Sequence, residues 1–186
     1  MNILQAIAAR RTIGQFTDDG VPREALRQLI EAALHAPNHR MTQPVRFRVL
    51  GPATRHAYGA ALGARKARKV EDPAAAQAVI DKVSATEAAV PAAIAVSVRV
   101  DDNPEIREED YATALMGVQN LMLAAVALGL GTRLRTGAVM DDPRAREALD
   151  VPDGERIVAI IQVGHPSSTP EAKPRKGVDE VTRWLE

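Results

Sequence analysis

The segment of residues 104–129 carries the longest helical pattern in the chain and constrains the fold most. Its first half is charged, whereas its second half is apolar on nearly every side. A helix that is apolar all round must be covered all round. In a chain of 186 residues, we expect this cover to come partly from the chain's own sheet and partly from a second subunit, with Met122 at the contact between subunits.

The other elements follow from the spacing of apolar residues and from the residues that interrupt it. Pro22 opens a helix with one apolar face, and Pro37 ends it, because a residue that precedes proline is disfavoured in helical conformation. Helices are expected over residues 2–10, 22–36 and 143–149, and two more over residues 53–89, with a break near residue 72. Strands are expected over residues 47–50, 93–100, 132–136 and 156–164.

The strands should differ in how they are covered. Ile94, Val96 and Val98 alternate with smaller or polar residues, so one face of that strand should be buried and the other less so. Residues 157–161 are continuously apolar, as is typical of a central strand covered on both faces. The tail should cross the surface before residues 181–185 dock. Together these features predict a single α+β domain over residues 1–186, with helices packed around one small sheet.

Composition argues against several classes of function. Lys plus Arg and Asp plus Glu each number 24, so the chain lacks the basic surplus of a nucleic-acid-binding protein. It has no cysteine, which excludes disulfides, thiolate nucleophiles and Cys-ligated zinc and agrees with a reducing compartment. The longest apolar run, residues 121–131, is shorter than a membrane span, and the start does not resemble a secretion signal. We therefore expect a cytoplasmic protein with no membrane partner.

Arg10, Arg11 and Thr12 close the first helix and form a candidate phosphate site. Two guanidinium groups and a hydroxyl can grip a phosphate, because arginine offers a planar fork of donors. The alternative is that both arginines offset the negative C-terminal end of that helix. The residues alone leave both interpretations open.

His35 and His39 lie four positions apart, a spacing that could bind a metal on an intact helix. Pro37 lies between them and breaks that geometry, so we expect no metal site. The loop that follows, residues 38–44, is dense in hydrogen-bonding groups. It either satisfies its own turn or presents donors to a polar ligand.

The stretch of residues 129–137 combines glycines with Arg135 and Thr136. Its glycines would let a bound group approach the backbone, or they could simply mark a helix end before an edge strand. The pattern is not a Rossmann fingerprint opening a helix. Basic clusters at residues 65–69 and 173–176 are either solvated surface or contacts for the phosphate of a nicotinamide cofactor.

Taken together, these motifs resemble the nitroreductase family of FMN enzymes, especially its short bacterial members. The resemblance rests on the order and spacing of weak motifs along nearly the whole chain. They are the opening residues 7–16, Ala36-Pro37, Gln43-Pro44, the glycines of 129–131, Arg135-Thr136-Gly137, Gly164-His165-Pro166 and the basic tail 173–176.

The resemblance implies an intertwined homodimer in which helices surround a small mixed sheet and FMN lies at the interface. No side chain need act as a catalytic nucleophile, because the cofactor carries the chemistry. NADH or NADPH would give hydride to FMN, leave, and be replaced by an oxidant in a ping-pong reaction. The implied FMN contacts are Arg10, Arg11 and Thr12 to the phosphate, ribityl chain and ring edge, Leu134, Arg135 and Thr136 along the flavin, Arg175 to the phosphate, and His35 and His39 from the partner subunit.

The chain departs from the family at two positions. Many relatives carry tryptophan after the Gln-Pro pair, where this chain has Val45, and short members have tryptophan where Leu134 stands. The acceptor therefore stays open between a nitro compound, a quinone and a related small molecule. Two alternatives remain on the same scaffold: a protein that binds FMN without useful turnover, and a flavin dehydrogenase of a specific metabolite.

Overall fold

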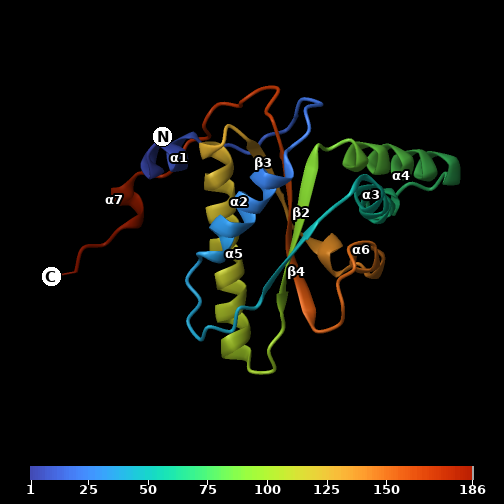
Figure 1. The fold of residues 1–186 in the computed structure, drawn as a ribbon. Helices are drawn as coiled ribbons and strands as arrows, with labels where there is room; N and C mark the ends of the chain where they lie inside the picture. The colour runs from blue at the N-terminus through green and yellow to red at the C-terminus, as the bar shows by residue number, and fades with distance from the viewer. Residues whose placement is uncertain (186) are drawn as a thin grey trace.

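A computed structural model describes residues 1–185 of the chain (Figure 1). Three of its helices begin alike, because Asp72, Asn103 and Asp142 each accept a hydrogen bond from a first-turn amide and each precede a proline at the first helical position. The helices of the described part are α1 (Ile3–Ala9), α2 (Arg23–Leu34), α3 (Pro52–Ala67), α4 (Pro73–Ala88), α5 (Pro104–Ala127), α6 (Pro143–Ala148) and α7 (Val178–Val181), with a 3-10 turn η1 (Ala138–Asp141), and the strands are β1 (Val45–Val49), β2 (Ala92–Arg99), β3 (Gly131–Arg135) and β4 (Glu155–Gly164).

The four strands form one sheet in the order β1-β2-β4-β3, so β2 and β4 are central and β1 and β3 lie at the edges. Each neighbouring pair runs antiparallel. The α+β class is confirmed, but the expected mixed sheet is wrong for these strands. Parallel pairing is found, within residues 1–185, in the isolated bridge between Thr12 and Thr132, where the segment after α1 passes the start of β3.

Helices cover both faces of the sheet. Figure 1 shows α2 and α5 on one side and α3, α4 and α6 on the other. Ile94 and Val96 of β2 face α5, whereas Ala93 and Ala95 face the second layer, and all four are buried. The expectation that one face of β2 is less buried is therefore wrong. Its small side chains do not mark solvent exposure; they leave room for helices to approach closely.

Helix α5 packs along the sheet, which provides the part of its cover that was expected from the chain itself. Leu121 and Ala125 are fully buried against the chain's own core, and Met122 is only 7% exposed. The expectation that Met122 faces a second subunit is therefore wrong. The solvent side of α5 instead carries Leu115 and Met116, which are 38% and 41% exposed.

Helices α3 and α4 pack closely enough that a glycine is required between them. A Cβ added at Gly59 would lie 2.7 Å from the Cα of Ser84 and 3.0 Å from the Cβ of Glu87. We expect Gly59→Ala to lower the free energy of unfolding by about 1–3 kcal/mol, because the two backbones must separate. Urea denaturation measures this loss. The matched variant Gly20→Ala, where a Cβ meets nothing within 4 Å, should change stability by less than about 0.5 kcal/mol.

The C-terminal segment does not pack on the chain's own body. The expected docking of residues 181–185 is not found in this chain; Figure 1 shows the segment that bears α7 extending away from the helices and sheet. Val181 is 68% exposed, Trp184 81% and Leu185 82%. We call residues 178–185 the C-terminal arm. Within residues 1–185, none of the helices combines the length and apolar character of a membrane span.

Candidate functional site

A cationic hollow of about 750 Å³ brings the end of α1 together with the tail of the chain. Arg10, Arg11 and Thr12 line it from one side, Arg175 from the other, and Gln119 of α5 lies between them. Four of the nine residues expected to hold a cofactor therefore share one surface, although more than 160 positions separate Arg175 from the other three. Lys173 adds a fourth positive side chain, against one carboxylate, that of Glu171.

The two arginines at the end of α1 contact different groups. Arg11 donates through Nη1 to the carbonyls of Ala8 at 2.6 Å and Arg10 at 2.9 Å, so it offsets the end of α1. The side chain of Arg10 has neither a hydrogen bond nor an ion pair within residues 1–185. Its guanidinium fork is therefore available to an anion in the hollow.

Leu134, Arg135 and Thr136 lie at the end of edge strand β3 and do not line the cationic hollow. Leu134 is 38% exposed, and Thr136 is also exposed. The side chain of Arg135 turns to the α4 side, where its Nη2 lies 2.8 Å from Oε1 of the buried Glu87. Their predicted contact with a cofactor stays a prediction.

His35 and His39 lie in the loop between α2 and β1, and neither of them lines the cationic hollow. Nδ1 of His39 lies 3.0 Å from Oε1 of Glu109 on α5, and Arg40 donates to the other oxygen of that carboxylate at 3.0 Å. The hydrogen bonds from His39 and Arg40 hold the pKa of Glu109 below its usual value. This cluster fixes the loop to the charged half of α5.

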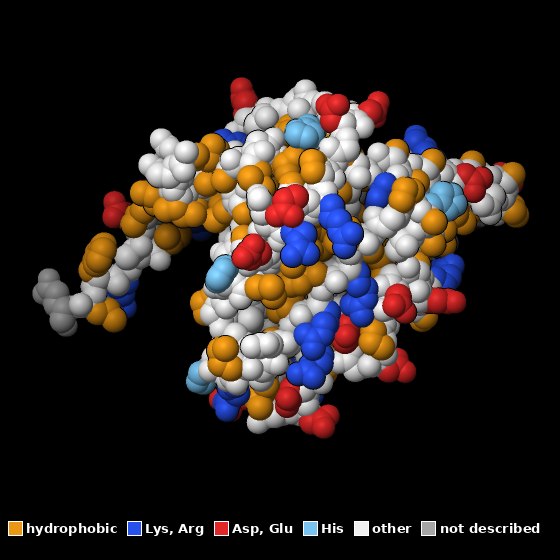
Figure 2. Space-filling model, viewed as in Figure 1, with side chains coloured by type: hydrophobic (Ala, Val, Ile, Leu, Met, Phe, Trp, Pro, Cys, Tyr) orange, Lys and Arg blue, Asp and Glu red, His pale blue; other side chains and the backbone are white. Residues whose placement is uncertain are grey.

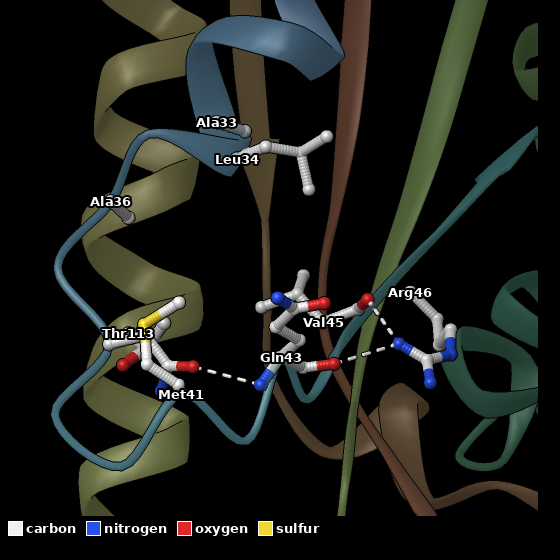
Figure 3. Close-up of a pocket in the computed structure, with 9 residues that line it drawn as sticks. Ala33, Leu34, Ala36, Met41, Gln43, Val45, Arg46 and Thr113 are labelled. Atoms are coloured by element: carbon white, nitrogen blue, oxygen red, sulfur yellow. Dashed lines mark hydrogen bonds between the residues drawn. The ribbon is translucent and has the colours of Figure 1, made fainter.

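The same loop lines a second hollow, of about 350 Å³ (Figure 3), and residues 38–44 are the loop for which the sequence left a polar ligand open. Met41 and Gln43 line it in the left-handed backbone region, with φ of 48° and 47°. Asn38 stabilises this geometry, since its Oδ1 accepts from the Gln43 amide at 2.8 Å. Leu34 and Val45 close the hollow on the apolar side. Strained backbone of this kind is often found at binding sites.

Among residues 1–185, no group of three or more His, Asp or Glu side chains is placed to hold a metal ion.

Comparison with known proteins identifies the scaffold. The model of the nitroreductase family matches residues 7–165, which is most of the chain. The chain belongs to the nitroreductase family. The Bacillus subtilis protein YfhC, named as a candidate NAD(P)H nitroreductase, is 32% identical to it over 169 residues, which are 91% of this chain and 87% of that protein.

Solved structures agree with this membership in the nitroreductase family. The nitroreductase-like family protein from Bacillus cereus superposes with a TM-score of 0.86 at 28% identity, covering 100% of this chain and 97% of that one. A nitroreductase-type protein from Desulfovibrio desulfuricans, solved in complex with FMN, gives a TM-score of 0.75 at 26% identity and covers 100% of this chain and 98% of that one.

This nitroreductase-family chain places small aliphatic residues where aromatic rings were expected from the family. Val45 lines the hollow of Figure 3, and Leu134 is exposed at the end of β3. Trp184 is the one tryptophan of the chain, and it lies on the C-terminal arm. These two positions therefore offer no ring on which a flat acceptor could stack.

Proposed function

We propose that this nitroreductase-family chain is an FMN-dependent oxidoreductase that transfers electrons from NADH or NADPH to a small acceptor such as a nitro compound or a quinone. The observation that carries the proposal is the cationic hollow, in which Arg10 has an uncommitted guanidinium beside Arg175 and Lys173. The similarity to YfhC, named as a candidate NAD(P)H nitroreductase, and to the Desulfovibrio desulfuricans protein solved with FMN supports the same proposal. The whole chain, residues 1–186, is taken as one FMN-binding domain.

The residues present fit an FMN phosphate. Besides Arg10, the hollow is lined by Arg11, whose buried Nε has no hydrogen-bond partner in the described part of the chain, so a donor of this residue is left without an acceptor. Arg10 and Arg175 would bind the phosphate, and Thr12 would donate to the ribityl chain. When bound, the flavin supplies the redox chemistry that no side chain of this sequence can supply. The protein's part is to bind, orient and exclude water.

We further propose that the site is completed in a homodimer. Figure 2 shows apolar side chains gathered over the region of α1 and along the C-terminal arm. Ile3, Leu4 and Ile7 of α1 are 50–73% exposed, which is unusual for one helix face of a monomer. A second copy would cover this face, and its His35 and His39 would then reach the flavin of the first.

The cytoplasm is the proposed place of action, because NADH and NADPH are held there as reduced donors. A small-molecule acceptor is the other partner that the proposal requires. The proposal includes neither nucleic acid nor a membrane as partner.

The test is the visible spectrum of the purified protein after incubation with FMN and desalting. We expect a retained flavin spectrum with about one FMN per chain. Addition of NADH or NADPH without oxygen should bleach the spectrum, and a nitro or quinone acceptor should restore it. A folded, dimeric protein that stays colourless would contradict the proposal. If FMN binds but neither NADH nor NADPH bleaches it, the protein binds FMN without acting as the proposed oxidoreductase.

A further inference from the structure

A charged cluster is enclosed between the end of β3 and the last turn of α4. Glu87 is 3% exposed there, and its Oε1 lies 2.8 Å from Nη2 of Arg135. Gln162 of β4 donates from Nε2 to the other carboxylate oxygen at 2.7 Å. One carboxylate therefore ties α4 to both β3 and β4.

Folding alone does not account for this cluster. Burial removes nearly all hydration from Glu87 and much of it from Arg135, and apolar side chains of similar volume often give equal or better stability. Tyr58 adds no compensation, because its buried hydroxyl has no hydrogen-bond partner within residues 1–185. Burial and the nearby Glu87 carboxylate raise the pKa of Tyr58 to about 12, so it stays a neutral phenol. An ion pair kept at this cost points to a role in the neighbouring site.

Arg135 stands in the middle of the Leu134–Thr136 segment. Side chains alternate along a strand, so anchoring Arg135 on the α4 side turns Leu134 to the opposite face, where it is 38% exposed. Beyond Thr136 the strand cannot continue regularly, because Gly137 has φ of 107°. Strand β3 pairs with β4 alone in the sheet, so the ion pair is an additional restraint on its last residues.

The pair also sets the charge beside this segment. A third hollow, of about 300 Å³, is lined by Arg133, Arg135 and Gln162 together with Gly14 and Gln15. A carboxylate 2.8 Å from a guanidinium offsets most of the positive charge that a group farther away would experience. Glu87 therefore fixes the position of the Arg135 side chain and offsets its positive charge.

We propose that Glu87 is a positioning residue for the flavin: through Arg135, it holds the Leu134–Thr136 segment in place and reduces the positive charge that the flavin ring experiences. This proposal rests on the proposed function, because it requires FMN at the end of β3.

The test is the midpoint potential of bound FMN in Glu87→Gln, measured by dye-coupled reduction of the loaded protein. Glutamine keeps the shape and can still accept from Arg135, but the guanidinium is then uncompensated. Reduction adds negative charge to the flavin, so we expect a more positive potential and a several-fold rise in the affinity for reduced relative to oxidised FMN. Asp81→Asn is the matched control: it removes one carboxylate from the exposed side of the same helix and should leave the potential unchanged.

A double variant, Glu87→Gln with Arg135→Gln, removes both charges and leaves no buried charge unpaired. Its potential should return to that of the wild type, while FMN should bind several-fold more weakly because amides hold the segment less firmly. An unchanged potential in Glu87→Gln, or the same shift in single and double variants, would overturn the proposal. If the single variant does not fold, wild-type FMN affinity in the double variant would overturn it. Failure of the proposed function looks different, because the wild type itself would then retain no FMN.

Discussion

Arg10→Ala should weaken FMN binding by roughly 10- to 100-fold, the loss expected when one charge-assisted contact to a phosphate is removed. Arg10 has no other partner in the described part of the chain, so its loss should leave the fold intact. The dissociation constant follows from titration of the apoprotein by quenching of flavin fluorescence. Thermal unfolding of the apoprotein should be unchanged.

Riboflavin makes this experiment specific for the phosphate. It lacks the phosphate, so Arg10→Ala should leave its affinity near that of the wild type. Arg27→Ala, an exposed arginine of α2 paired with Glu24, is the control for a lost positive charge elsewhere. Equal losses for FMN and riboflavin would place Arg10 on another part of the cofactor, and an unchanged FMN affinity would refute the phosphate assignment.

The elements of the fold could be predicted where their causes are local. The pair Asp72-Pro73 marks a helix start in the sequence itself, since capping and proline act within a few residues. The direction in which α5 faces could not be predicted, because its apolar half has no polar side to mark the solvent. Whether Met122 or Met116 is exposed depends on where the sheet lies, and that is a tertiary property.

The candidate site divides in the same way. Arg10 and Arg175 could be expected together only from the family resemblance, because no local pattern relates residues so far apart. Glu87 was missed, although the sequence held a signal. It is the one charged residue between Lys82 and Arg99, in a stretch of small and apolar residues. A lone carboxylate in such a stretch must be paired when it is buried, but the sequence does not say with which partner.

Met116→Glu should weaken the proposed dimer by about 3–5 kcal/mol, because each isologous contact would bury an uncompensated carboxylate. Met116 is 41% exposed on α5, one turn before Gln119, which lines the cationic hollow. The exposed apolar side chain of Met116 and the cationic hollow therefore adjoin each other along α5. We expect a partner that covers Met116 to close the hollow as well, so FMN affinity should fall together with the dimer. Analytical ultracentrifugation and FMN titration of the same samples measure both effects.

Two further variants separate the interface from general effects of charge. Ala57→Glu adds the same carboxylate to the exposed side of α3, across the sheet from α5, and should alter neither assembly nor FMN binding. Met116→Leu keeps an apolar side chain of similar volume and should retain both properties. A Met116→Glu monomer that binds FMN as tightly as the wild type would show that the hollow is complete within one chain. Because neither His35 nor His39 lines the hollow of its own chain, such a monomer would also count against their predicted contact with FMN.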